Sequence, residues 1–505
     1  MKLNEFTGGL STRLDPTLIG GNEAVVFTNI DNAKGNLTSI NNYLLSGTSI
    51  DRWFYKFDDV WYSSINNREY LEYKSKLYWT EKENRPRKVV RGIEKDVGII
   101  APTTKLASVI NNTGSITTTT TAVQYMYTYY DSSEGVESAP SPVSDELALV
   151  ATKSVDLSGF LPSGNIFVDT IRLYRVGADT TDFTLLIELP IATTTYNDNI
   201  KTLDALGDIL ETYDYQPPII GLRYLIEAYG ILFAAKDDKV YYTEIGVPDA
   251  WPGLNFISIS GDVTGLAAIP DGIVIYTKDK AYLLLGTESS AFRIILLSPE
   301  HGCIEHNSIK VVKNTLLWAS ADGICALSGN AIDVITKDKL GRKTFEIVSA
   351  TVFSEQYLLT LLDGSVFIAD LRFNLSFKNI KYIDAEVYNL GVFDNILYGV
   401  VKEQLALIDK GVPVDFYYTS PRLTEGDNSI IKLYNNIYIR ANGRFLVDIF
   451  ISNKLVSSEE IIGDGIFELK VPQEKQRGTD IQFKVEGTGV VYEIEYKTVG
   501  RENGR

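Results

Sequence analysis

The chain has 505 residues, of which 45% are hydrophobic and 11% aromatic, so it can build a large core spread over two or three domains. Its formal net charge of −17 argues against holding DNA or RNA through phosphate contacts, because such binding depends on clustered Lys and Arg. Two cysteines exclude a disulfide framework, and no apolar run reaches the roughly 18 residues of a membrane-spanning helix. Met1 to Phe6 shows no leader peptide, so we expect an unprocessed protein, and the scarcity of cysteines predicts folding in a reducing cytosol.

The first hundred residues combine an irregular segment with aromatic strand patterns. Residues 1–45 are rich in Gly, Asn and Thr and have little periodicity, so we expect an extended N-terminal arm. Residues 46–99 carry two aromatic hairpin arms, Trp53 to Tyr62 and Tyr70 to Trp79, which together predict the first blade of a β-propeller. The longest basic stretch, Arg85 to Arg91, follows acidic residues, and we interpret it as a solvated loop.

Short apolar strands separated by turns that contain Pro and Gly occupy residues 100–216. The clearest strands are Tyr125 to Tyr130, Val168 to Val176 and Phe183 to Leu189, and a polar loop runs from Asp131 to Pro142. Strands at this spacing predict a β-sandwich of the fibronectin type III or immunoglobulin-like kind. Blade-like sequence lies on both sides of this stretch, so we predict that the sandwich is inserted into the propeller.

Residues 217–410 repeat one pattern about every forty residues: an apolar strand, a tight polar turn and a second apolar strand. The five turns lie 40 to 43 residues apart, at Asp237, Asp279, Asp322, Asp363 and Glu403. This is the period of a four-stranded propeller blade, and strands that are apolar at nearly every position need neighbours on both faces. The Asp-Gly pairs that begin at Asp322 and Asp363 predict two-residue hairpin loops, which need positive φ angles. An unclosed sandwich is the alternative architecture.

Alternating strands dominate residues 411–505. Runs such as Phe445 to Ile451 and Asp480 to Val485 place apolar residues on one face and polar residues on the other, which is typical of an antiparallel sheet with one solvated face. We therefore predict a C-terminal β-sandwich or platform. The predicted fold class is all-β: a propeller of about six blades, an inserted fibronectin III/Ig-like sandwich and a C-terminal antiparallel platform.

His301, Cys303 and His306 are the candidate metal ligands, because the only two histidines of the sequence flank a cysteine. Against a zinc site, His306 would point to the opposite face of an extended strand from the other two, and no fourth ligand is evident. No carboxylate pair stands out for glycosidase chemistry, and the sequence has no phosphate-binding loop and no Gly-x-Ser-x-Gly motif. We therefore expect no catalytic residues, no cofactor and no enzymatic activity.

Several segments, taken in order along the chain, resemble the tail nozzle or tail tubular protein B family of short-tailed bacteriophages. The resemblance begins in the arm and continues through the inserted strands into the blades. Its segments are Gly8 to Pro16, Asn22 to Ala24, Asn29 to Asp31, Glu137 to Pro142, Val168 to Arg175, Leu206 to Leu210 with Pro217 and Pro218, Gly230 to Ala234, Val240 to Thr243, Pro248 to Pro252, and Gly302 with Cys303. The chain departs from the simplest family members in having the inserted sandwich.

The resemblance implies a virion structural protein that forms a ring, usually of six subunits, below the portal and adaptor rings at the head vertex. Such a ring would extend the DNA-ejection channel and dock fibres or spikes on its outside, after assembly in the host bacterial cytoplasm. An acidic channel that repels phosphate would let phage DNA pass without specific binding. The alternative hypothesis is a receptor-binding, or carbohydrate-binding and depolymerising, propeller of a phage tail.

Overall fold

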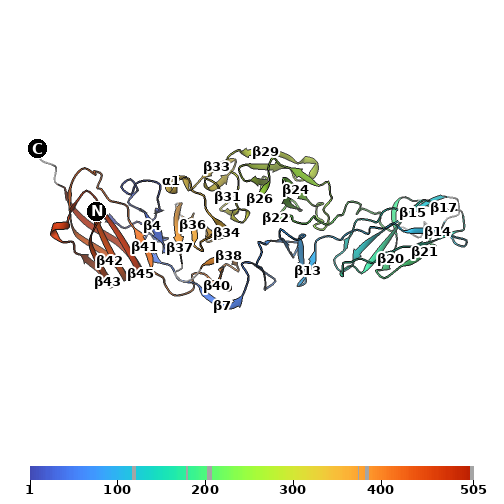
Figure 1. Cartoon of the computed structure of the whole chain (residues 1–505), viewed down its shortest axis with the longest axis horizontal. Helices are drawn as coiled ribbons and strands as arrows, with labels where there is room; N and C mark the ends of the chain where they lie inside the picture. Colours follow the sequence, from blue (N-terminus) through green and yellow to red (C-terminus); the bar gives the residue numbers. More distant parts are fainter. Residues whose placement is uncertain are drawn as a thin grey trace. The chain divides into compact units, whose positions relative to one another are not determined.

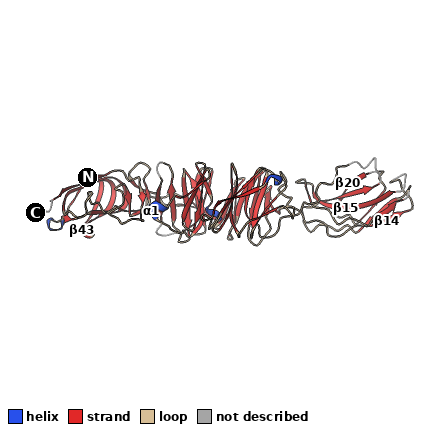
Figure 2. Cartoon of the chain, turned by 90° about the horizontal axis from the view of Figure 1, so that it is seen from above, coloured by secondary structure: helices blue, strands red, loops and turns tan. Residues whose placement is uncertain are grey.

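The computed structural model describes residues 1–116, 121–149, 151–177, 180–201, 207–372, 375–381 and 386–500, and β-strands dominate these ranges (Figure 1, Figure 2). The helical segments among them are short: α1 (Lys337–Leu340) and the 3-10 turns η2 (Ser289–Ala291), η3 (His306–Ser308) and η4 (Gln473–Lys475). No helix in the described part of the chain is long and apolar enough to cross a membrane. The prediction of an all-β protein is confirmed.

Two compact units divide the chain. The first unit comprises residues 1–68, 274–284 and 294–505, and the second comprises residues 69–273 and 285–293. Each unit has its own hydrophobic core, and each is described separately below.

The second unit contains, among its described residues, two four-stranded antiparallel sheets. The strands of the first, in order, are β10 (Glu69–Tyr73), β11 (Lys76–Thr80), β12 (Arg87–Val90) and β13 (Ile93–Asp96). Those of the second are β22 (Arg223–Ala228), β23 (Ile231–Lys236), β24 (Lys239–Tyr242) and β25 (Phe256–Ser258), and β26 (Val263–Ile269) follows in the chain. Tyr78 of β11, Leu232 of β23 and Trp251 of the segment between β24 and β25 belong to one core, so the sheets pack against each other.

The basic stretch Arg85 to Arg91 is not a solvated loop, so that prediction is wrong. It contains strand β12, which pairs with β11 on one side and β13 on the other. Lys88 is 2% exposed and Val89 is fully buried. The sequence could not reveal this, because the carboxylates that neutralise Lys88 come from distant parts of the chain.

Two further antiparallel sheets of the second unit lie between β13 and β22 in the sequence, and we call them the inserted sheets for this position in the chain alone. Their orders are β14-β18-β21 and β16-β15-β19-β20, with β17 also paired to β15. The strands are β14 (Ala107–Asn111), β15 (Thr121–Asp131), β16 (Val136–Glu137), β17 (Leu147–Leu149), β18 (Ser154–Ser158), β19 (Thr170–Gly177), β20 (Thr180–Pro190) and β21 (Thr195–Asp198). Alternating residues of β15 and β19 enter a shared core that includes Tyr125, Tyr127, Ile171 and Leu173. The strands predicted at 125–130 and 183–189 are confirmed within β15 and β20, and the one predicted at 168–176 is confirmed as β19, which begins two residues later.

The five repeated hairpins are confirmed. The first is β23 and β24 of the second unit. The others are β27 (Gly272–Thr277) with β28 (Ala281–Leu285), β31 (Thr315–Ser320) with β32 (Gly323–Ser328), β35 (Gln356–Leu361) with β36 (Val366–Asp370), and β39 (Ile396–Val401) with β40 (Gln404–Leu407). They are flanked by β29 (Arg293–Ser298), β30 (Lys310–Val312), β33 (Ala331–Val334), β34 (Ile347–Phe353), β37 (Ser376–Ile380) and β38 (Val387–Phe393). Strand β27 is buried at every position, as expected of a strand covered on both faces.

The two Asp-Gly turns differ from the predicted two-residue loops. Gly323 and Gly364 have φ angles of 141° and 76°, but Asp322 and Asp363 do not have positive φ. The backbone N–H of Gly364 donates to the carbonyl oxygen of Leu361 at 3.0 Å, which closes a four-residue turn with the glycine last. An Asp-Gly pair suits both this arrangement and the predicted one, so the pair alone could not distinguish them.

Strand β7 (Leu44–Ser49) joins segments that are distant in the sequence. It pairs antiparallel with β40 and gives the sheet β38-β39-β40-β7, in which Leu44 lies opposite Leu407. All six residues of β7 are exposed, so the sequence carried no burial pattern for this strand. The two hairpin arms that were predicted to form one first blade belong to different sheets. Strands β8 (Trp53–Phe57) and β9 (Val60–Ser64) form a two-stranded sheet, whereas Tyr70 to Trp79 belongs to β10 and β11.

The N-terminal segment and the C-terminal strands share one sheet in the first unit. Its order is β34-β35-β36-β37-β4-β41-β45-β42-β43. The N-terminal strands are β1 (Lys2–Leu3), β2 (Gly9–Leu10), β3 (Glu23–Ala24), β4 (Val26–Thr28), β5 (Ile30–Asp31) and β6 (Leu37–Ser39), and the short C-terminal ones are β41 (Phe416–Thr419) and β44 (Arg477–Gly478). Phe6, Phe27 and Ile30 lie in the same core as Phe445 and Ile494. Residues 1–45 are thus extended and also packed into the core of this unit.

Three long strands form the C-terminal part of this sheet: β42 (Lys432–Ile451), β43 (Lys454–Leu469) and β45 (Ile481–Gly500). Gly443 in β42 pairs with Gly463 on one side and Gly489 on the other, and their φ angles lie between 116° and 145°. A Cβ on Gly443 would meet the backbone of Thr488. A line of glycines across adjacent strands allows long strands to curl, and Figure 1 shows these strands bent.

Candidate functional site at a buried ion network

The three candidate metal ligands, His301, Cys303 and His306, are not grouped as ligands of one ion in the described structure. His301 Nδ1 lies 2.8 Å from Ser298 Oγ, and Cys303 Sγ donates to the carbonyl oxygen of Glu305 at 3.2 Å. Burial raises the pKa of the Cys303 thiol to about 12, which keeps it protonated, whereas metals bind the thiolate. In the ranges that the structure describes, no three His, Cys, Asp or Glu side chains are grouped so that they could hold a metal ion. Cys303 and Cys325 are core residues, as predicted.

Six charged side chains, of which only Lys76 is partly exposed, form a cluster in the second unit, which we call the junction network. They come from strands β11, β12 and β13, from the end of β15 and the loop after it, and from the segment between β24 and β25. The members are Lys76, Lys88, Lys95, Asp131, Glu134 and Asp249. Three positive charges meet three negative charges, so the network is neutral as a whole.

Lys88 lies at the centre of the junction network. Its Nζ is 2.8 Å from Asp249 Oδ2 and 2.8 Å from Glu134 Oε2. Asp249 also accepts the backbone N–H of Gly98 at 2.8 Å, and the other oxygen of Glu134 lies 2.8 Å from Lys76 Nζ. Each buried charge therefore has a partner, which is the condition for keeping charges away from water.

Lys95 connects strand β13 to the inserted sheets. Its Nζ lies 2.9 Å from Asp131 Oδ2, at the end of β15. It also lies 4.4 Å from the ring centre of Phe167, just before β19, a distance suited to a cation–π contact. The inserted sheets are therefore tied to the β10–β13 sheet by charge pairs at more than one point.

The pKa shifts show which effect prevails in the network. Burial alone would lower the pKa of Lys88, but the charges and hydrogen bonds of Asp249 and Glu134 outweigh burial and raise it. Burial alone would raise the pKa of Glu134, but Lys76 and Lys88 outweigh burial and lower it. Both groups are therefore held in their charged forms at neutral pH.

A second charged group lies on the inserted sheets beside the junction network. Arg172 Nη1 binds Glu137 Oε2 at 2.8 Å, and its guanidinium stacks 3.5 Å from the ring centre of Tyr130. The hydroxyl of Tyr174 donates to Glu137 Oε1 at 2.7 Å. These contacts fix the residues that follow the loop of Glu134.

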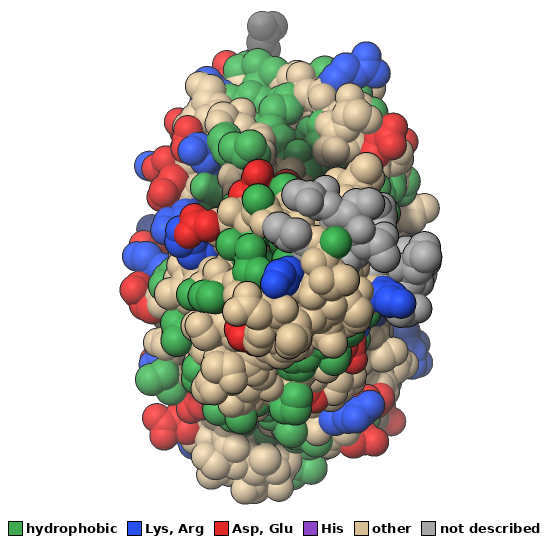
Figure 3. Space-filling model, turned by 90° about the vertical axis from the view of Figure 1, so that its right-hand side faces the viewer, with side chains coloured by type: hydrophobic (Ala, Val, Ile, Leu, Met, Phe, Trp, Pro, Cys, Tyr) green, Lys and Arg blue, Asp and Glu red, His purple; other side chains and the backbone are tan. Residues whose placement is uncertain are grey.

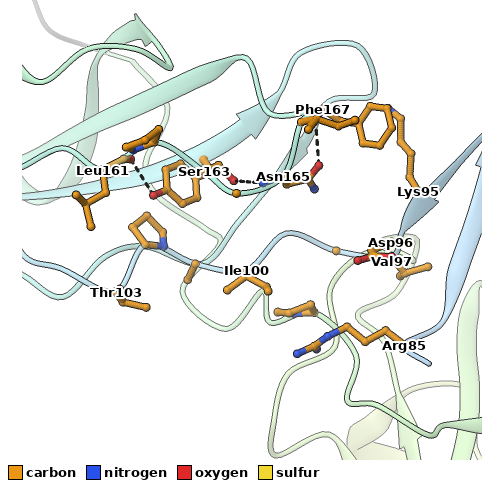
Figure 4. A pocket seen from close by; sticks show the side chains of 18 of the residues that line it. Arg85, Lys95, Asp96, Val97, Ile100, Thr103, Leu161, Ser163, Asn165 and Phe167 are labelled. Atoms are coloured by element: carbon orange, nitrogen blue, oxygen red, sulfur yellow. Dashed lines mark hydrogen bonds between the residues drawn. The ribbon is translucent and has the colours of Figure 1, made fainter. Parts of the chain in front are cut away.

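Two cavities flank the junction network within the second unit. The first has a volume of about 470 Å³, and Figure 4 shows Lys95 against the ring of Phe167 at one end of it. Asn165 Oδ1 accepts the backbone N–H of Phe167 at 3.0 Å, which holds the loop that carries this ring. The neighbouring Ile166 is 89% exposed. The second cavity has a volume of about 770 Å³, and Lys76, Glu134 and Asp249 of the network are among the residues that line it.

On the face that Figure 3 shows, the acidic side chains do not form a single negatively charged patch. Side chains of both signs lie mostly toward two margins of this face, and apolar and uncharged groups occupy the area between them. A surface of this kind on one face is suited to protein contacts, because large fields of a single sign are absent from it.

Three solved structures align with the chain, each at 12% identity or less. No protein-family model matches it, and no curated protein matches it. A heterotrimeric Nup82 NTD–Nup159 TAIL–Nup145N APD complex from Chaetomium thermophilum aligns with a TM-score of 0.22 and 12% identity, over 29% of this chain and 41% of that chain. The present chain therefore spans about two fifths of the length of that protein.

Two other solved structures align over more of the chain. The computationally designed Ika8 protein gives a TM-score of 0.27 at 9% identity, over 72% of this chain and 99% of that chain. BamB from Moraxella catarrhalis gives a TM-score of 0.28 at 10% identity, over 67% of this chain and 92% of that chain. Similarities this low give no information on function, so the functional argument has to come from the chain's own residues.

The sequence analysis assigned a functional role to none of the members of the junction network. Lys88 and Asp249 are 161 positions apart, and no local pattern links them. One signal was present: Lys88 is followed by two valines, and a lysine within an apolar strand sequence needs a carboxylate partner if the strand is buried.

Proposed function

We propose that this chain is a non-enzymatic structural protein of a bacteriophage tail. In this proposal it is a subunit of the nozzle ring, which extends the DNA-ejection channel below the portal and adaptor rings and docks fibres, spikes or other tail proteins. Its location is the virion, and its partners include further copies of itself in a ring of six. Phage DNA passes through the channel without specific binding.

The architecture proposed for this role is a propeller of about six blades with an inserted fibronectin III- or Ig-like sandwich and a C-terminal platform. Four-stranded antiparallel sheets occur in both units, and the hairpins recur every 40 to 43 residues. Strand β7 adds further support, because a strand from near the start of the chain completes a sheet formed by β38, β39 and β40. Such an exchange is a simple way to close a ring of blades.

The observation that carries the functional proposal is the junction network. Modules joined within one chain are expected to move relative to each other unless their contact is large or specific. Here Lys88, Lys95 and Glu134 hold the inserted sheets on the β10–β13 sheet through buried charge pairs. A module fixed in this way presents its outer loops in one orientation, which suits a subunit that positions neighbours in a large assembly.

The charge of the chain supports the channel part of the proposal. Each subunit carries a formal charge of −17, so a ring of six carries six times that charge. Excess negative charge raises the cost of phosphate contact, so that the genome does not adhere to the ring as it passes.

The experiment that tests the proposal is native mass spectrometry with negative-stain electron microscopy of the purified chain, alone and with portal and adaptor proteins. We expect closed rings of six subunits, and no retardation of double-stranded DNA at physiological salt. A chain that stays monomeric and does not associate with phage tails would contradict the proposal. Cleavage of host surface polysaccharide by the pure chain would contradict it as well, because the proposal assigns no enzymatic activity.

A further inference from the structure

The larger cavity of the second unit, about 770 Å³, has a surplus of acidic groups. Strands β11, β16, β19 and β20 and four segments between strands line it. Its charged lining residues are Lys74, Lys76, Arg172, Glu134, Glu137, Asp208, Glu211 and Asp249. Five of these are carboxylates and three are cations, so the lining is negative overall.

Most of these charges are already paired, and two carboxylates are not. Glu134 and Asp249 belong to the junction network, and Glu137 binds Arg172. Asp208 and Glu211 are exposed, and their carboxylates have no ion-pair or hydrogen-bond partner among the described residues. Their charges are therefore available to a ligand.

Lys74 does not neutralise this pair of carboxylates. Its ammonium group donates to the carbonyl oxygen of Gly246 at 2.6 Å and lies 5.5 Å from the ring centre of Tyr73. No carboxylate of the described residues lies within ion-pair distance of it.

Two tyrosines give the cavity a second feature that favours a cation. Tyr174 and Tyr215 line it beside Glu137 and Glu211, and burial followed by the charges of Glu244, Glu211 and Glu137 raises the pKa of Tyr215. The electron-rich faces of such rings attract ammonium and guanidinium groups.

Tyr78 gives an independent sign of an unfilled contact. It lines the same cavity and is 1% exposed, and its hydroxyl has no hydrogen-bond partner in the described part of the chain. Buried hydroxyl groups are nearly always hydrogen-bonded. An N–H donor entering the cavity would supply the missing partner.

We propose that this cavity is the docking site for a basic side chain, above all an arginine, of a partner protein. A guanidinium carries five N–H donors in a planar fork, so one group can bind the carboxylates of Asp208 and Glu211 together. The apolar side chains of Leu185, Ile209 and Val247 in the same lining can cover its methylene stem. The assignment goes beyond the nozzle proposal and does not depend on it, because it concerns the isolated chain.

The test uses the full chain and two blocked pentapeptides, each with one central residue between pairs of glycines. The central residue is arginine in one peptide and citrulline, its neutral analogue, in the other. Binding is measured by ligand-observed NMR and calorimetry. We expect the arginine peptide to bind at least roughly tenfold more tightly than the citrulline peptide, and to weaken as salt is raised, since the carboxylates are exposed.

Matched variants locate the site. Asp208→Asn and Glu211→Gln should each weaken the arginine peptide about two- to fivefold, the range of an exposed ion pair, and the double variant should weaken it further. Asp214→Asn is the control, because Asp214 is also exposed and lies in the same segment but outside the cavity lining. Thermal melting checks that all four variants fold. Equal binding of the two peptides, no binding of either, or an equal effect of Asp214→Asn would overturn the proposal.

Discussion

Replacing Lys88 with methionine should detach the inserted sheets more than it destabilises the rest of the protein. The substitution keeps the length of the side chain and removes its charge. Lys88 is 2% exposed and has two carboxylate oxygens at 2.8 Å, so its loss leaves buried negative charge behind. Removing one partner of a buried ion pair costs about 3–5 kcal/mol.

The structure places the expected value at the lower end of that range. Without Lys88, Glu134 keeps Lys76 at 2.8 Å and Lys95 at 3.7 Å. Asp249 keeps only the backbone N–H of Gly98, so it becomes the one poorly compensated charge. We therefore expect Lys88→Met to lower the free energy of opening this region by about 3 kcal/mol. The value is at the low end of the range because the substitution leaves one carboxylate without a charged partner rather than two.

The assay is native-state hydrogen exchange followed by mass spectrometry, because a chain with two compact units does not unfold in one step. Peptides that cover β12, β13 and the loop after β15 should lose protection, while the core around Tyr125 keeps it. The double variant Lys88→Met with Asp249→Asn should lose less stability than the two single variants lose in sum, because it removes both charges of one pair.

A control variant shows whether the loss of stability depends on the burial of the ion pair or would follow the removal of an exposed pair as well. Arg444 and Glu460 pair at 2.7 Å, but their side chains are 74% and 50% exposed. Arg444→Gln should change stability by less than about 1 kcal/mol, as exposed pairs do. If Lys88→Met changed local opening as little as Arg444→Gln, the junction network would not be what holds the inserted sheets.

Three further predictions follow from other features of the fold. Lys76 and Lys88 lower the pKa of Glu134 in the folded protein, so the contribution of this carboxylate to stability should be complete above the usual carboxyl pKa of about 4.5. That contribution should be lost as the pH falls through the lowered pKa of the folded protein, and hydrogen exchange of the loop after β15 from pH 6 to pH 3 measures it. Gly443→Val should prevent the C-terminal sheet from forming, whereas Gly465→Ala, which meets open space, should be tolerated, as circular dichroism and thermal melting would show. Burial raises the pKa of Cys303 to about 12 and that of Cys325 to about 11, so neither thiol should react with a maleimide at pH 7.5 until the protein is denatured.

The hairpins could be predicted from the sequence because their signals are local. Gly272 to Leu284 shows two apolar strands and a polar turn within thirteen residues, and the structure places β27 and β28 there. The details of the turns at Asp322 and Asp363 could not be predicted, because one residue pair serves two kinds of loop. Local patterns thus identified the strands but not the conformation of each connection.

Long-range pairing and buried charge could not be predicted. Strand β7 is exposed at all six positions, and only the edge of β40, which is distant in the sequence, makes it a strand. Arg85 to Arg91 looked solvated because its charges were visible in the sequence and their partners were not. The sequence analysis thus identified the polar loop from Asp131 to Pro142, which carries part of the candidate site, but it did not predict that this loop contributes buried charges.

The cavity and the junction network share Lys76, Glu134 and Asp249, and this shared wall links the two proposals. Apolar residues of the same volume would stabilise the attachment of the inserted sheets at least as well as buried ion pairs do. Ion pairs add direction, because each lysine fits one arrangement of oxygens, and they also give one side of the cavity its charged groups. An arginine bound at Asp208 and Glu211 would therefore rest on a wall whose orientation is already fixed, so little ordering free energy would be lost on docking.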